Sequence, residues 1–183
     1  MFAMRVIVLE ADGLPVWALG AYGNDWIATP HLDEFAAGGV VFDQHFVATP
    51  QQRERLSEVI YPDVPSLLPP WQFDVDPDGD DAIQPLMTPQ PGLLPADDEE
   101  TRHRLRLTFA AVVEEFDGWF GEWVESIDES EWNAATVILT AGRGQNLGEH
   151  RLVGEALPWL HEELVHVPLI VRRPRGEPYW PTD

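Results

Sequence analysis

The sequence contains no cysteine and no lysine. Without cysteine it can form neither disulfides nor thiolate metal sites, and it has no cysteine nucleophile. Its 11 basic residues are all arginine and stand against 32 acidic residues, which gives a formal net charge of -21. A field of this sign repels nucleic acid and anionic membrane surfaces, so we expect neither as a partner.

Long apolar runs are missing as well. No run approaches the ~20 residues of a membrane span, and the first predicted strand begins too early to leave room for a signal peptide. We therefore expect a cytoplasmic protein. The acidic excess suits either a high-salt cytoplasm or a GC-rich genome, and composition does not separate these two.

The 183 residues fit one domain, residues 1–183. Within it we expect an N-terminal half at 1–62, a linker or loop rich in proline and aspartate at 63–100, and a C-terminal half at 101–183. Apolar patterning predicts strands near residues 6–9, 40–42, 136–140 and 167–171. It predicts helices near residues 31–37, 51–60, 99–127 and 159–164. Continuous apolar strands alternating with helices favour an α/β fold with a covered parallel sheet.

Asp12 follows the first predicted strand at its C-terminal end. Open α/β sheets bind their ligands at this edge, so Asp12 is a candidate ligand or metal carboxylate. The alternative is an aspartate that caps the next helix, a role for which this residue type is also favoured.

Three groups of short motifs occur in order along the chain. The first comprises the strand with Asp12, Ala18-Leu-Gly-Ala-Tyr-Gly23, Thr29-Pro-His-Leu-Asp33, Ala36-Ala-Gly-Gly-Val-Val-Phe42 and Ala48-Thr-Pro50. The second comprises Phe109-Ala-Ala-Val112, Asp117 and Phe120-Gly121. The third comprises Thr136-Val-Ile-Leu-Thr140, Leu147-Gly-Glu-His150, Leu152, Gly154 and Val167-Pro-Leu-Ile-Val171. Together they resemble the sulfatases of the alkaline phosphatase superfamily.

This resemblance implies a shortened three-layer sandwich with a mostly parallel central sheet. It also implies a divalent cation, usually Ca²⁺, held by oxygen ligands, and a formylglycine nucleophile made from cysteine or serine. Asp12 matches the first metal-binding aspartate of the family. The second falls on Gly13, and the later Asp-His or Asp-Asn pair falls on Gly142 and Arg143. Because arginine has no lone pair to donate, Arg143 cannot replace a metal ligand.

The nucleophile position falls on Thr49 or Gln52, depending on where the alignment is anchored. Neither residue can become formylglycine, although Arg53 matches the arginine that follows the nucleophile. The lysine common after the third motif is absent, with Glu155 in its neighbourhood. His150 matches a position at the rim of the family's site, with a structural histidine as the alternative. His166 carries no motif support and is expected to serve packing.

Two further hypotheses concern acidic residues. Asp12 and Arg143 should follow strands of one sheet, so an ion pair between them could fill the lost cation site. The segment 74–80 resembles the opening of an EF-hand loop, but Pro85 stands where the bidentate glutamate should be. We expect that segment to be a solvated acidic loop.

The sequence therefore predicts a sulfatase-like protein that has lost its metal and nucleophile positions and acts as a binding or protein-interaction module. Its partner could be a small anionic ligand bound by Arg53 and Arg143, another protein, or a second copy of the chain. No cofactor is expected. The alternative is an active sulfuric or phosphoric ester hydrolase that uses Thr49, Asp12 and His150 with an unusual Ca²⁺ site. A remnant that folds without a selected function is a third alternative.

Overall fold

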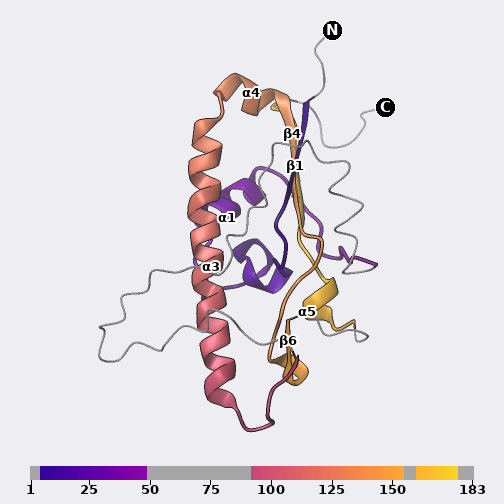
Figure 1. The fold of residues 1–183 in the computed structure, drawn as a ribbon. Coiled ribbons are helices and arrows are strands. Elements are labelled where there is room, and N and C mark those ends of the chain that lie inside the picture. Colours follow the sequence, from indigo (N-terminus) through magenta and orange to yellow (C-terminus); the bar gives the residue numbers. More distant parts are fainter. Residues whose placement is uncertain (1–4, 49–91, 155–159, 177–183) are drawn as a thin grey trace, which may run out of the picture.

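The computed structural model describes residues 5–48, 92–154 and 160–176. Helix α1 (Pro30–Ala37) and the long helix α3 (Glu99–Ser126) lie on one side of a four-stranded sheet, as Figure 1 shows. The helix predicted at residues 51–60 and the acidic segment 74–80 lie outside the described residues. Among the helices of the described ranges, none is both long enough and apolar enough to span a membrane.

The four-stranded sheet has the order β1-β4-β7-β2. Strands β1 (Arg5–Glu10) and β4 (Ala135–Thr140) pair in parallel over six residues, from Arg5 opposite Ala135 to Glu10 opposite Thr140. Strand β7 (Leu169–Arg172) is antiparallel to β4, and β2 (Val40–Val41) is antiparallel to β7. The α/β class is confirmed, but the described sheet is mixed where we expected a mostly parallel one.

The antiparallel pairing follows from the connection between β4 and β7. After β4 the chain forms a hairpin of β5 (Asn146–Leu147) and β6 (Leu152–Gly154), and later the short helix α5 (Glu162–Val165). These elements lie at the end of the sheet where β4 finishes (Figure 1). The chain therefore re-enters the sheet from the end at which it left, whereas a parallel neighbour needs a crossover to the opposite end.

Residues 63–91 of the predicted linker lie outside the described residues, but its last part and the helix predicted at 159–164 differ from expectation. Residues Gly92–Leu93, inside the predicted linker 63–100, form strand β3 and pair with β6, which gives a second sheet of order β3-β6-β5. The helix predicted at 159–164 starts later, because His161 has extended backbone angles and precedes α5 as its N-cap residue.

Helix α3 supplies much of the core. Its Asp98 cap accepts a hydrogen bond from the Thr101 amide, and its apolar residues recur every three to four positions, as predicted. Phe116 and Phe120 are 2% and 1% exposed, and each fully buried side chain of this size contributes about 1.5–3 kcal/mol. They belong to one apolar cluster with residues from α1 and the sheet, including Leu32, Phe35, Leu9, Val137, Leu139 and Ile170.

Candidate functional site

The site predicted from the sequence lies where β1 and β4 end. The two strands are parallel neighbours, so the loops that follow them meet at one edge of the sheet. Two backbone hydrogen bonds join these loops, from the Ala11 amide to the Thr140 carbonyl at 2.9 Å and from the Gly13 amide to the Arg143 carbonyl at 3.2 Å. They bring Asp12 and Arg143, 131 positions apart in the sequence, to the same place.

Asp12 and Arg143 form the ion pair that we hypothesised. Arg143 donates through Nε to Asp12 Oδ1 at 3.0 Å and through Nη2 to Oδ2 at 3.2 Å. The Arg143 side chain is 17% exposed and that of Asp12 is 23% exposed, so solvent only partly screens the pair. This bidentate geometry fixes both orientation and charge. The expected alternative, a helix cap, is not what the structure has, since the next helical turn, η1 (Val16–Ala18), is preceded by Pro15.

Gly13 and Gly142, the two glycines beside this pair, leave little freedom for a side chain. Gly13 has φ of 84°, in the left-handed region that side chains rarely adopt. At Gly142 a Cβ atom would meet the Glu10 carboxylate, which already lies in that space. Aspartate at either position would therefore need backbone strain or movement of Glu10.

His150 lies in a different cluster. Its ring stacks on that of His161 with a centroid separation of 4.0 Å, and its Nε2 lies 3.6 Å from Glu163 Oε1. His161 and Glu163 were not predicted from the sequence. The available signal was the spacing His161-x-Glu163, which gave no reason to connect them with His150 before the hairpin and α5 were placed.

Several motif residues have a packing role. The Asp117 carboxylate on α3 accepts hydrogen bonds from the amides of His31 and Leu32 at 3.2 and 2.8 Å, which caps the N-terminus of α1. Burial raises the pKa of Asp117, and these two amides oppose the shift. Gly121, one turn along α3, leaves room for the His31 ring, which a Cβ atom would meet.

Two of the N-terminal motifs, 18–23 and 29–33, are joined by hydrogen bonds and also have a packing role. The Thr29 hydroxyl accepts a hydrogen bond from the Gly20 amide at 3.1 Å, and Asp33 Oδ1 accepts one from the Ala21 amide at 2.8 Å. A Cβ atom at Gly20 would meet the Asp33 carboxylate. These contacts hold α1 against the turn η2 (Gly20–Tyr22).

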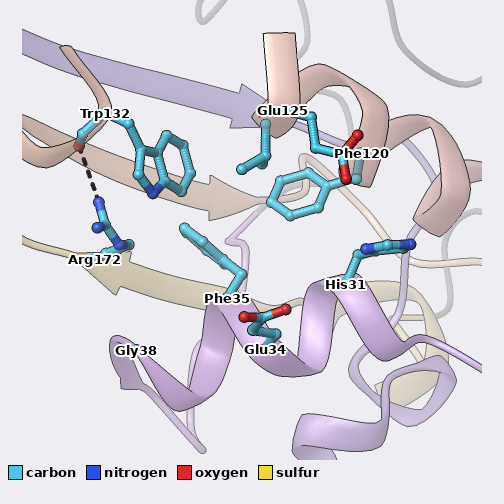
Figure 2. Close-up of a pocket in the computed structure, with 10 residues that line it drawn as sticks. His31, Glu34, Phe35, Gly38, Phe120, Glu125, Trp132 and Arg172 are labelled. Atoms are coloured by element: carbon cyan, nitrogen blue, oxygen red, sulfur yellow. Dashed lines mark hydrogen bonds between the residues drawn. The ribbon is translucent and has the colours of Figure 1, made fainter. Parts of the chain in front are cut away.

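A cavity of about 470 Å³ lies among α1, α3, α4 (Glu129–Ala134) and β7. Figure 2 shows Phe35 and Phe120 lining it between His31 and the pair Trp132 and Arg172. Arg172 donates through Nη1 to the Trp132 carbonyl at 3.1 Å, and its guanidinium carbon lies 4.5 Å from the centroid of that indole. Because Arg172 pairs with Val137 near the start of β4, this cavity is at the opposite end of the sheet from Asp12.

Comparisons with known proteins agree with the motifs. The chain is 44% identical over 46 residues to human steryl-sulfatase, which is 25% of this chain and 8% of that protein. It is 28% identical over 76 residues to a multifunctional alkaline phosphatase superfamily protein of Trinickia caryophylli, which is 41% of this chain and 14% of that protein. No protein-family model matches the chain.

The fold extends the likeness over nearly all of the chain. The structure of a 2-O GAG sulfatase superposes with a TM-score of 0.62 at 16% identity, covering 93% of this chain and 64% of that one. These partial sequence matches, together with the shared fold, support assigning the chain to the alkaline phosphatase superfamily. It is sulfatase-like in fold, and it spans less than two thirds of that sulfatase structure and far less of the two curated relatives.

The residues at Asp12 do not suit the Ca²⁺ that sulfatase resemblance implies. Such a site needs several oxygen donors around one cation. Here the Arg143 guanidinium, itself a cation, lies within hydrogen-bond distance of both Asp12 oxygens. The other family positions fall on Gly13 and Gly142, which bring no side-chain donor. The nucleophile candidates Thr49 and Gln52, together with Arg53, lie outside the described residues.

Proposed function

We propose that this sulfatase-like protein has no ester hydrolase activity at the Asp12 site and acts as a binding module. The observation that carries the proposal is the bidentate ion pair between Asp12 and Arg143. In a metal-dependent hydrolase the cation polarises the ester and stabilises the nucleophile. A guanidinium can balance the Asp12 charge, but it accepts no electron pairs from a nucleophile or substrate oxygen as a metal ion does.

The same pair bears on what the protein would bind. Asp12 neutralises the Arg143 charge, so a small anion would have to compete with a carboxylate that already occupies two donors of the guanidinium. We therefore favour a protein partner over a small anionic ligand. We also propose a cytoplasmic location, because a chain without cysteine forms no disulfides and suits a reducing compartment.

One experiment separates this function from the hydrolase alternative. The purified full chain is analysed for bound metal and assayed with aryl sulfate and aryl phosphate esters in the presence of Ca²⁺. We expect no turnover above a buffer control and no rise in the unfolding temperature on adding Ca²⁺. Turnover that disappears in Asp12→Ala would overturn the proposal.

A variant can also test whether the ion pair stands in for the cation. Gly142→Asp combined with Arg143→His restores the pair of ligand types that the family carries. We expect this double variant to bind Ca²⁺ more tightly than the parent chain. Arg5→His, at the opposite end of β1, is the matched control and should leave Ca²⁺ binding unchanged.

Binding to proteins is tested by sedimentation of the pure chain and of its mixture with an excess of small anion. A second copy as partner predicts a mass that doubles with concentration and does not respond to sulfate or phosphate. Saturable sulfate or phosphate binding that is lost in Arg143→Gln would instead favour the anionic ligand.

A further inference from the structure

A second cluster of chemically active side chains lies apart from the Asp12 ion pair. It consists of His150, His161 and Glu163, and one ligand atom from each lies within 4.8 Å of the other two. The imidazoles stack at 12°, with centroids 4.0 Å apart. His150 Nε2 is 3.6 Å from Glu163 Oε1, and these two side chains are 55% and 21% exposed. The cluster is therefore open to solvent on the His150 side.

The hairpin that carries His150 is anchored by contacts outside the cluster. The neighbouring Glu149 accepts hydrogen bonds from the Leu147 amide at 2.7 Å and from Arg106 at 3.1 Å. Arg151 donates through Nε to the Leu94 carbonyl at 2.8 Å. His150 itself has φ of 51°, a left-handed conformation that costs energy outside glycine. The fold thus holds this histidine in a strained position on a fixed turn.

The segment that carries the other two residues is fixed from its own side. The Leu164 amide donates to the His161 carbonyl at 3.0 Å, and the Gly144 amide donates to the Leu164 carbonyl at 2.8 Å. Gly144 has no Cβ, and one would collide with the Glu163 carbonyl oxygen. This close approach connects α5 directly to the loop after β4. Both halves of the cluster are therefore positioned without depending on each other.

One oxygen of the cluster lacks a partner in the described part of the chain. Glu163 Oε2 is buried and makes no hydrogen bond there. A buried carboxylate oxygen without a partner loses its hydration and gains no hydrogen bond in return, which destabilises the folded state. A cation bound at this carboxylate would remove the penalty, and the overall charge of -21 raises the local concentration of cations.

We propose that His150, His161 and Glu163 form a binding site for a Zn²⁺-class transition metal ion. Two imidazoles and one carboxylate are a donor set used at zinc sites that keep a position open. Tetrahedral ligands about 2.0–2.1 Å from zinc lie roughly 3.4 Å from one another, close to the 3.6 Å between His150 Nε2 and Glu163 Oε1.

The stacked imidazoles lie in nearly parallel planes, so one ring must rotate out of the stack before both lone pairs can point at one ion. The exposed His150 ring has room to rotate, since more than half of its side chain faces solvent. Imidazole donors favour zinc, copper, nickel or cobalt over Ca²⁺ and Mg²⁺, which prefer oxygen ligands. The site is thus chemically distinct from a sulfatase Ca²⁺ centre.

The test is a Zn²⁺ titration of the full chain after dialysis against a chelator, with Co²⁺ absorption as a second readout. We expect one tight equivalent of Zn²⁺, a visible Co²⁺ ligand-field band and a higher unfolding temperature with metal. His161→Gln and Glu163→Gln should each weaken binding by about tenfold or more. His103→Gln, which changes an exposed histidine on α3, is the control and should bind as the parent does.

Two outcomes overturn the site. One is a Zn²⁺ affinity that is the same in the parent, His161→Gln and Glu163→Gln, as expected for ions held by acidic side chains elsewhere. The other is the absence of any equivalent that binds more tightly than Ca²⁺. Circular dichroism checks folding, and if Glu163→Gln does not fold, His161→Gln and His150→Asn decide the question. Asparagine is chosen at position 150 because it tolerates the left-handed backbone.

Discussion

The Asp12–Arg143 ion pair should make a measurable contribution to the free energy of unfolding, which a double-mutant cycle can isolate. The variants are Asp12→Asn, Arg143→Gln and the combination. Exposed ion pairs contribute about 0–1 kcal/mol, whereas removing one partner of a fully buried pair costs about 3–5 kcal/mol. The Arg143 side chain is 17% exposed, the Asp12 side chain is 23% exposed, and two hydrogen bonds join them, so this pair lies between those limits. We expect a coupling energy of about 2 kcal/mol.

The assay is urea unfolding followed by far-ultraviolet circular dichroism, at low and high salt. The chain offers a matched control in the Arg5–Glu131 pair, which has a similar separation of 2.9 Å but side chains 56% and 54% exposed. That pair should couple by less than about 1 kcal/mol and lose most of its effect in salt. A coupling energy below about 0.5 kcal/mol for Asp12 and Arg143 would show that the two side chains do not stabilise each other, because sites without contact already deviate from additivity by that much.

Three further predictions concern packing and pH. Asp117→Ala should lower the free energy of unfolding by about 2 kcal/mol, because it leaves two amides of α1 without their acceptor; urea unfolding measures this, and a loss under about 0.5 kcal/mol would contradict the capping role. Gly144→Ala should cost about 1–3 kcal/mol in the same assay, since a Cβ atom would meet the Glu163 carbonyl, and an unchanged midpoint would show that α5 can move away freely. Burial and the nearby His166 lower the pKa of His45 in the folded chain. The stability that the neutral imidazole contributes is therefore present above about pH 6.5 and is lost as the pH falls through the folded-state pKa. Thermal unfolding should show the parent chain losing stability relative to His45→Gln on acidification, and parallel pH curves for the two chains would contradict this.

The elements with strong periodicity could be predicted from the sequence. Strand β1 and helices α1 and α3 lie within a few residues of their expected bounds, because long apolar patterns specify both period and buried face. The direction of β7 could not be predicted, since an apolar run has the same pattern in parallel and antiparallel neighbours. Direction depends on where the preceding connection runs, and short elements such as β5, β6 and α5 leave weak signals.

The candidate site was predictable to a similar extent. The motifs placed Asp12 and Arg143 after strands of one sheet, and their opposite charges suggested the ion pair that the structure has. The roles of Asp117 and Gly121 were not predictable, because each is defined by an α1 residue some ninety positions earlier. His161 and Glu163 were not predicted for the same reason, because only the folded chain brings His150 next to them.

The aromatic packing of α3 against α4 gives the protein an intrinsic optical signature. Trp119 and Trp123 stack at 15° with centroids 6.2 Å apart, and Trp123 meets Trp132 at 82° and 6.1 Å. Indoles this close exchange excitation energy, which depolarises their fluorescence. The packed, asymmetric surroundings of these indoles also give the protein a tryptophan band in the near-ultraviolet circular dichroism. Loss of that band would report separation of α4 from α3 while the helices themselves stayed intact, without any attached label.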